Sequence, residues 1–158
     1  MRKVALCFGL IFLLCSCKKD SSSYTTGLKD NLENYNNLLR FIEKNYKKEF
    51  LKYKDSNIIV FADCNLGGNN YKTIICNAND VLEKMSILDI TEITFEKYSE
   101  NCNKNYGFNQ VNFKLKKEAL ESTVYYRYEY CGTGKIYKSN TIIYEPVDSN
   151  WSVFVDLN

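Results

Sequence analysis

One apolar stripe along the N-terminal third of the chain limits its fold more than any other feature. The stripe repeats at steps of four and three residues through Leu28, Leu32, Tyr35, Leu39, Ile42, Tyr46, Phe50 and Tyr53. This spacing predicts one amphipathic helix, on the order of 40 Å long at 1.5 Å per residue, with Thr25 or Thr26 as its N-cap. A coiled-coil arm would show the same stripe. Strand patterns begin directly after it, however, and need a helix to cover them.

Strand patterns occupy most of the remaining sequence. Ranges 57–63 and 71–76 flank the Gly-containing segment 65–70, and together they predict a hairpin. Asp80, with Glu83 three residues later, predicts the start of a short helix over 80–88. Further strands are predicted at 90–98, 110–117, 123–131, 135–145 and 151–157. A helix followed by a run of strands indicates the α+β class with an antiparallel sheet.

The last three strands predict two distinct sheet faces. With a turn at Thr133-Gly134, Val124 faces Ile143, which in turn faces Val153. One face then collects Val111, Phe113, Leu115, Val124, Tyr126, Tyr128, Tyr130, Tyr137, Ile143, Trp151, Val153 and Val155. The other face collects Arg127, Glu129, Lys138, Asn140, Ser152 and Asp156, and in this register Glu129 faces Lys138. A long helix on a curved antiparallel sheet is similar in shape to cystatin and NTF2-like proteins, an analogy that implies no function.

The N-terminus carries the pattern of an export signal. Arg2 and Lys3 precede an apolar run over 4–14, which is too short to span a membrane and has the length of a signal-peptide core. The sequence Leu14-Cys15-Ser16-Cys17 then resembles the lipobox of bacterial lipoproteins. The resemblance implies cleavage between Ser16 and Cys17 and a diacylglycerol on Cys17. The alternative is an ordinary secretory signal with a chance cysteine.

This resemblance divides the chain into a signal peptide over 1–16, a lipidated polar tether over 17–23 and one globular domain over 24–158. Lys18 and Asp20 after the cysteine are similar to the start of many Bacteroidota lipoproteins. The implied location is the cell envelope, with the outer membrane favoured. Removing residues 1–16 leaves 19 basic and 19 acidic side chains, so membrane attachment would rest on the acyl chains alone.

Four cysteines remain beyond the anchor: Cys64, Cys76, Cys102 and Cys131. An even number in an exported chain favours disulfides, of which three connectivities exist. We expect Cys64–Cys76 and Cys102–Cys131. Four unpaired buried thiols are the alternative.

Several kinds of chemistry are excluded or disfavoured by the sequence. The chain has no His, which removes His-based nucleophile pairs and His-ligated metal centres, and its formal net charge of +2 argues against nucleic-acid binding. The segment from Asp63 lacks the Glu that an EF-hand loop needs at its twelfth position, which is Ile74. Gly132-Thr133-Gly134-Lys135 does not complete a phosphate loop, and we read it as a turn. No cofactor, metal or catalytic residue is predicted.

The outward sheet face offers the best lead to function. The predicted register sets Tyr125, Ile142 and Phe154 side by side, next to Arg127, Asn140 and Asp156. An aromatic row with a polar rim is typical of a binding patch for a protein or a glycan. The alternative is that the helix over 80–88 covers this row, or that the sheet curls over it.

We therefore expect a lipid-anchored, non-enzymatic binding domain whose partner is an unidentified envelope protein or ligand. A small hydrolase using Glu129 and Asp156 is one alternative. An immunity or inhibitor lipoprotein that neutralises a secreted toxin is the other.

Overall fold

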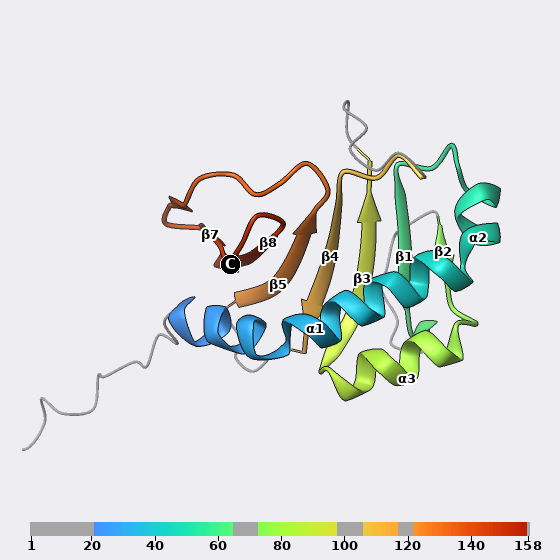
Figure 1. The fold of residues 1–158 in the computed structure, drawn as a ribbon, viewed down its shortest axis with the longest axis horizontal. Coiled ribbons are helices and arrows are strands. Elements are labelled where there is room, and N and C mark those ends of the chain that lie inside the picture. Colours follow the sequence, from blue (N-terminus) through green and yellow to red (C-terminus); the bar gives the residue numbers. More distant parts are fainter. Residues whose placement is uncertain (1–20, 65–72, 98–105, 117–121, 158) are drawn as a thin grey trace, which may run out of the picture.

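The computed structural model describes residues 21–64, 73–97, 106–116 and 122–157, and they form the expected α+β fold (Figure 1). The elements in chain order are α1 (Ser21–Asn45), α2 (Lys47–Lys52), β1 (Ile58–Ala62), β2 (Ile74–Ile75), α3 (Asn79–Ile87), β3 (Ile90–Glu96), β4 (Gln110–Leu115), β5 (Ser122–Glu129), β6 (Tyr137–Lys138), β7 (Ile142–Pro146) and β8 (Trp151–Leu157). The described strands make one open sheet in the order β2-β1-β3-β4-β5-β8-β7-β6, and all pairs except β1–β2 are antiparallel.

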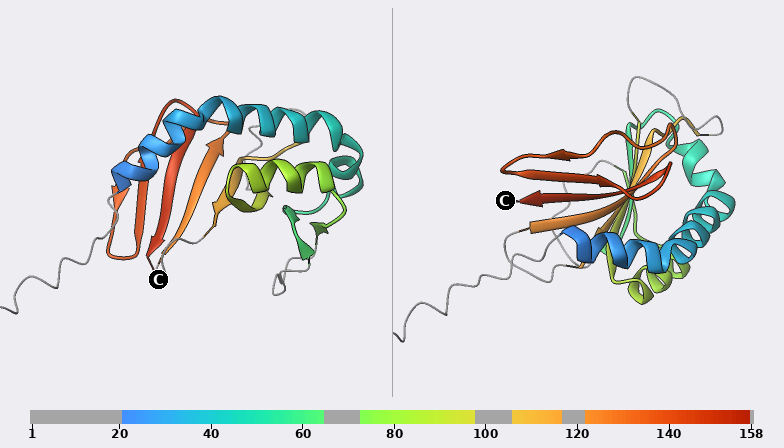
Figure 2. Two further views of the ribbon diagram at one scale, coloured as in Figure 1. Left: turned by 90° about the horizontal axis from the view of Figure 1, so that it is seen from below. Right: turned by 60° about the vertical axis from the view of Figure 1, so that its left-hand side comes forward.

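The described helices cover only one side of the sheet. Both α1 and α3 lie on that side, and the strands β5 to β8 splay away from β1 to β4, so the sheet is strongly twisted (Figure 2). Phe50 of α2 packs against Phe61 and Phe95 on the same side. We call the opposite side of the sheet the outer face. No helix of the described ranges lies on it.

The apolar stripe forms the helix side of the core, as predicted, but it runs through two helices. Tyr46 separates α1 from α2, and its hydroxyl donates a hydrogen bond to Oδ1 of Asp80 in α3. The N-cap prediction was wrong, because α1 already includes Ser21, and the hydroxyl of Thr25 bonds Ser21 O inside the helix at 3.1 Å. Residues 21–23, which we had placed in the tether, are therefore helical.

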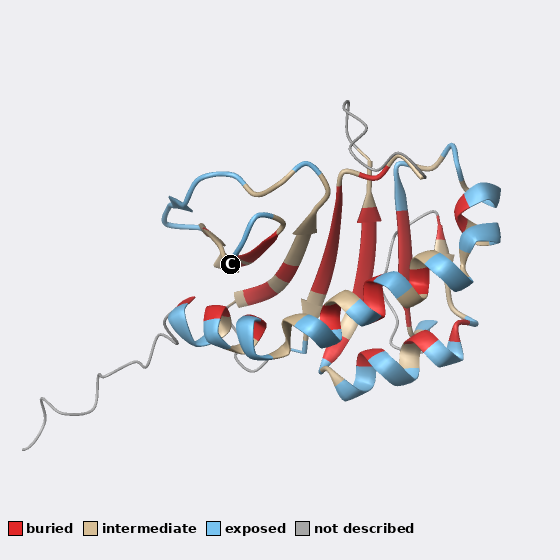
Figure 3. Cartoon of the chain, viewed as in Figure 1, coloured by how far each residue is buried: buried red, intermediate tan, exposed pale blue. Residues whose placement is uncertain are grey.

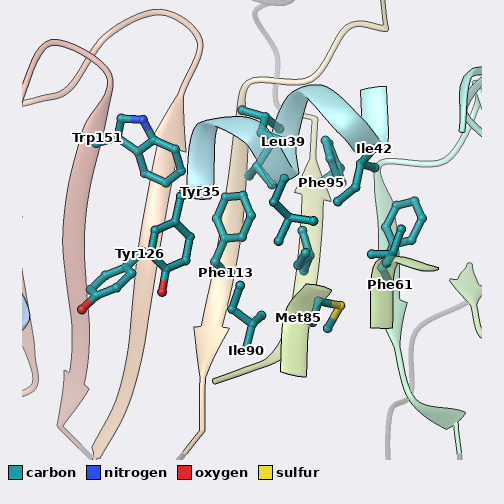
Figure 4. Packing of buried hydrophobic residues seen from close by; sticks show 14 of the residues in the cluster. Tyr35, Leu39, Ile42, Phe61, Met85, Ile90, Phe95, Phe113, Tyr126 and Trp151 are labelled. Atoms are coloured by element: carbon teal, nitrogen blue, oxygen red, sulfur yellow. The ribbon is translucent and has the colours of Figure 1, made fainter. Parts of the chain in front are cut away.

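Aromatic rings dominate the core between α1 and the sheet. Tyr35 of α1 meets Phe113 and Tyr126 edge-on, with ring centroids 5.6 Å and 5.1 Å apart, and lies 6.0 Å from Trp151 (Figure 4). The central strands β1, β3 and β4 are the most buried part of the sheet (Figure 3). Edge-on ring packing of this kind stabilises a core beyond the area that it buries.

The hairpin predicted near the middle of the chain is wrong, whereas the short helix predicted after it is present. Strands β1 and β2 pair in parallel, with Val60 opposite Ile74, so they do not form a hairpin. A Gly-containing segment predicts that the chain turns, but it does not decide in which direction the next strand runs. The helix predicted over 80–88 is confirmed as α3, but it begins one residue earlier, at Asn79. Its N-cap is Ala78, without a side-chain cap, and Asp80 lies inside its first turn.

The order of the last strands also differs from the prediction. The range 135–145 splits into β6 and β7, and β8 lies between β5 and β7. Val124 pairs with Val155, which pairs with Ile143. Alternation assigns each residue to a face but does not select the neighbouring strand. Strand β8, with Trp151 and Val153 fully buried, takes the interior position, whereas β6 lies exposed at the edge with Tyr137, which we had expected on the buried face.

Candidate functional site

Three of the four residues of the predicted binding patch come together on the outer face. Tyr125 pairs directly with Phe154, their ring centroids are 5.9 Å apart, and Arg127 lies two residues along β5. The third member of the aromatic row is Tyr144, which pairs with Phe154. Ile142 instead pairs with Asp156, one row further along, because β8 rather than β7 is the neighbour of β5.

The helix α3 does not cover this patch. It packs beside α1 on the core side, where Val81 and Met85 join the hydrophobic core. Tyr125 and Phe154 are half-buried among their neighbours on the outer face. In the described ranges, the covering helix that we had weighed as an alternative is therefore absent from this side of the sheet.

The outer face forms a small polar pocket beside the patch. Its cavity volume is about 180 Å³, and its walls come from four adjacent strands, β3, β4, β5 and β8. The lining residues are Glu92, Thr94, Glu96, Asn112, Tyr125, Arg127, Phe154 and Asp156. We call this cavity the outer-face pocket. It contains the aromatic pair and the arginine of the predicted patch, and Asp156 from its predicted polar rim. Glu92 and Glu96 also line it, and the sequence analysis had assigned these two carboxylates to no site.

A chain of hydrogen bonds holds one wall of the outer-face pocket. Asn112 donates from Nδ2 to Oε1 of Glu96 at 2.9 Å and accepts at Oδ1 from Nε of Arg127 at 2.8 Å. Gln110 donates to the other oxygen of Glu96 at 2.7 Å. Because the amide of Asn112 must donate to a carboxylate and accept from a guanidinium, only one orientation of that amide fits. The network therefore fixes the position of Arg127.

Arg127 presents unused donors to the pocket. Its guanidinium stacks over the Phe154 ring at 4.3 Å, and only its Nε is hydrogen-bonded within the described residues. The two terminal amino groups are thus left to solvent or to a ligand. A guanidinium fixed by stacking and by one bond loses little further freedom when a ligand binds its free edge.

Glu92 and Asp156 supply unused acceptors. Glu92 is only 5% exposed, and its Oε1 accepts a bond from Thr94 Oγ1 at 2.9 Å. Its other oxygen and both oxygens of Asp156 have no partner among the residues that the structure describes. Strand geometry sets Glu92 and Glu96 roughly 13 Å apart along β3, and Asp156 lies three strands away, so the backbone places the carboxylates at separate corners.

Glu129 and Asp156 do not form a catalytic pair. Asp156 pairs with Thr123, six residues before Glu129 on the same strand, which separates the two positions by roughly 20 Å along β5. Paired glycosidase carboxylates lie within about 10 Å of each other. Glu129 has a structural role instead, because its Oε2 accepts bonds from Tyr144 Oη at 2.6 Å and Ser152 Oγ at 3.1 Å. Burial and the bond to Glu129 raise the pKa of Tyr144.

A second, apolar groove lies on the helix side of the molecule. Its volume is about 400 Å³, and it runs between α1 and α3. The groove is lined by Asn34, Asn37, Leu38, Phe41, Lys84, Ile87 and Leu88. Ile87 is 75% exposed, and Nζ of Lys84 lies 4.8 Å from the centre of the Phe41 ring. This groove offers apolar contact area but few fixed hydrogen-bonding groups.

The remaining predicted sites are partly tested by the structure. The disulfide between Cys64 and Cys76 is present, with Cα atoms 5.5 Å apart. Cys131 is also disulfide-bonded, whereas its expected partner Cys102 lies outside the described residues. Ser16 and Cys17 of the lipobox lie outside them as well. The chain turns at 129–132, just before the predicted turn at Thr133-Gly134: the N–H of Gly132, with a φ of 91°, bonds Glu129 O at 3.1 Å. The predicted hairpin across Thr133-Gly134 does not form, because β5 and β6 are not neighbours in the sheet.

Sequence reasoning missed the polar wall of the pocket although its pattern is visible. Glu92, Thr94 and Glu96 alternate with buried apolar residues along β3, and Gln110 and Asn112 do the same along β4. We had used these ranges only to predict strands. Polar alternation normally indicates a solvent-exposed face. Only the pairing of β3 with β4, and of β4 with β5, shows that these side chains line one buried wall.

No helix in the described ranges combines the length and apolar character needed to cross a membrane. Within the same ranges, no three His, Cys, Asp or Glu side chains are grouped so that they could hold a metal ion. Comparison of the chain with protein-family models, with curated proteins and with solved structures found no match.

Proposed function

We propose that this chain is an exported, lipid-anchored domain that binds a ligand at the cell envelope through the outer-face pocket. The observation that carries the proposal is a polar cavity, walled by hydrogen-bonded side chains, on the sheet face that no described helix covers. A small number of fixed polar groups in a concave site is the usual form of a ligand-binding pocket. Glu129 and Asp156, the pair considered for a hydrolase, lie too far apart along the sheet to act together.

The buried polar wall supports binding rather than a purely structural role for this face. Glu92, Thr94, Gln110 and Asn112 are all less than a tenth exposed. Burying such groups costs free energy unless they are hydrogen-bonded, and an apolar sheet face would avoid the cost. The spare acceptors of Glu92 and Asp156 and the spare donors of Arg127 are the groups that a ligand would satisfy. A wall fixed in advance also lowers the entropic cost of binding.

The proposed anchor would hold this domain close to the bilayer. Only residues 18–20 separate Cys17 from α1, which starts at Ser21. At about 3.5 Å per extended residue, this connection reaches no more than roughly 14 Å. Several acyl chains on one cysteine give stable attachment, so the domain would stay at the membrane surface.

The anchor is tested by metabolic labelling with a radiolabelled fatty acid in cells that express the wild type or Cys17→Ala. We expect label on the wild type and none on the variant, and we expect only the wild type in the membrane fraction. Equal labelling of both proteins would refute the anchor. The binding claim is independent of this result and needs its own test.

Binding is tested by passing an envelope extract over immobilised protein and identifying retained molecules by mass spectrometry. Three forms are compared: the wild type, the pocket double variant Glu92→Gln/Asp156→Asn, and Glu33→Gln. Glu33 is exposed on α1, on the other side of the sheet, and so provides a matched control. We expect a molecule retained by the wild type and by Glu33→Gln but lost from the double variant. Retention that does not differ among the three would refute a role for the pocket.

A further inference from the structure

The outer-face pocket has room for one small ring or a fragment of that size. Its volume is about 180 Å³. For comparison, an apolar cavity of about 150 Å³ in another protein holds benzene. A single six-membered ring therefore fits, whereas a folded peptide segment or a fused ring system does not enter as a whole. A longer molecule would place only its terminal unit in the pocket.

The hydrogen-bonding groups of the pocket are of two opposite kinds. The free edge of Arg127 can only donate, whereas Glu92 and Asp156 can only accept when ionised. A hydroxyl group both donates and accepts, so a ring with several hydroxyls can satisfy both kinds at once. Bonds to charged partners are the stronger class, and they give direction as well as affinity.

The charges of the lining argue for a neutral ligand. Glu92, Glu96 and Asp156 carry three formal negative charges against one positive charge on Arg127. An anion is disfavoured by this excess. A cation would be repelled by the guanidinium of Arg127. Contacts with Asn112 and Phe154 hold this side chain in the middle of the wall, between β4 and β8. The carboxylates stand at separate corners and not around one point, which suits several hydroxyls better than one ammonium group.

The aromatic rim adds an apolar contact on one side of the pocket. Tyr125 lines the cavity and is half-buried, and Phe154 lies beside it under the guanidinium of Arg127. A pyranose has an apolar C–H face as well as its ring of hydroxyls. We propose that the outer-face pocket binds a single neutral pyranose, presented as the terminal sugar of an envelope glycan. This inference rests on the proposed function and names the class of its ligand.

The test is a binding titration of the purified mature protein in detergent, with the heat of binding measured by isothermal titration calorimetry. The neutral probes are glucose, galactose, mannose and N-acetylglucosamine, and the charged probes are ethylamine, acetate and alanine. We expect saturable binding of at least one neutral sugar. Because each substitution replaces a charged acceptor by a neutral one, Glu92→Gln and Asp156→Asn should each weaken that binding at least about tenfold. Glu33→Gln should leave it unchanged.

Circular dichroism and thermal unfolding of each variant show whether it is folded, and Asp156→Asn removes no bond among the described residues. Binding of ethylamine, acetate or alanine, lost in Asp156→Asn while no sugar binds, would overturn the sugar assignment and leave the proposed binding function standing. Absence of binding by every probe would overturn the sugar assignment. The extract experiment would then decide the proposed function separately. Sugar binding that persists unchanged in both pocket variants would also overturn the assignment of the sugar to this pocket.

Discussion

Replacement of Asn112 by leucine tests whether the hydrogen-bonded wall holds the outer face together. Asn112 is only 6% exposed, and both ends of its amide are used. One end donates to Glu96 at 2.9 Å, and the other accepts from Arg127 at 2.8 Å. Leucine has a similar volume but can make neither bond. The substitution therefore removes two charge-assisted hydrogen bonds while it changes the packing little.

The expected loss of stability follows from these two bonds. Each bond to a charged group contributes about 1.5–3 kcal/mol. Gln110 still holds one oxygen of Glu96, and the open pocket lets water reach the groups that are left unpaired, which lowers the cost. The buried apolar surface of leucine returns about 1 kcal/mol. We expect a net decrease of about 2–4 kcal/mol in the free energy of unfolding.

Urea unfolding followed by circular dichroism measures this change. The midpoint should fall while the slope of the transition stays the same, because the surface exposed on unfolding is almost unchanged. Asn37→Leu is the matched control, since Asn37 is exposed on α1, and it should change the stability by less than about 0.5 kcal/mol. An Asn112→Leu protein as stable as the control would refute the reasoning that this network carries the wall.

Three further outcomes follow from the core, the disulfide and the buried tyrosines. Phe113→Ala should cost about 3–5 kcal/mol of unfolding free energy, because the ring is fully buried against Tyr35 and Trp151, and a loss below 1 kcal/mol by calorimetry would contradict the described core. Changing Cys64 and Cys76 together to Ser should cost about 3 kcal/mol, since the bond closes a loop of sequence separation 12, and an unchanged urea midpoint would speak against it. Burial raises the pKa of Tyr126 to about 12, whereas it is about 10 in the unfolded chain, so stability should be full below pH 10 and decrease from pH 10 to 12. Ionisation of Tyr126 near pH 10 in the still-folded protein, measured by ultraviolet absorbance against Tyr126→Phe, would contradict this assignment.

The periodicity of the sequence predicted the elements and their buried faces well. The stripe that contains Tyr35 and Phe50 packs on the sheet, and Val124, Tyr126 and Val153 face the core as expected. These predictions succeed because burial is a property of each residue and its nearest neighbours along the chain. The even number of cysteines beyond the anchor indicated disulfides, and the expected pair Cys64–Cys76 is present.

Strand order could not be read from the same pattern. Placing β7 or β8 beside β5 keeps Val124 and Val153 on the buried face in either case, so alternation does not distinguish the two sheets. The difference decides the site, because it exchanges Ile142 for Tyr144 in the aromatic row. The parallel pairing of β1 with β2 escaped the sequence for a similar reason: turn residues show where a chain bends and not which way it returns.

The polar wall shows a further limit of reading one strand at a time. Glu92 and Asn112 each look like ordinary solvent-facing positions of an amphipathic strand. They become a site only when β3, β4 and β5 are adjacent and Arg127 stacks on Phe154 from β8. Patches built from several strands depend on contacts between residues far apart in the sequence, and no local pattern records those contacts.

The central claim is that the outer face, and not the helix side, is where this protein binds its ligand. The most direct measurement is a nuclear magnetic resonance titration of the isotopically labelled protein with the molecule that the wild type retains from the envelope extract. We predict that the signals of Tyr125, Arg127 and Phe154 shift in a saturable manner, while those of Phe41 and Ile87 in the groove between α1 and α3 stay in place. Shifts confined to the groove, with the outer-face signals unmoved, would contradict the account.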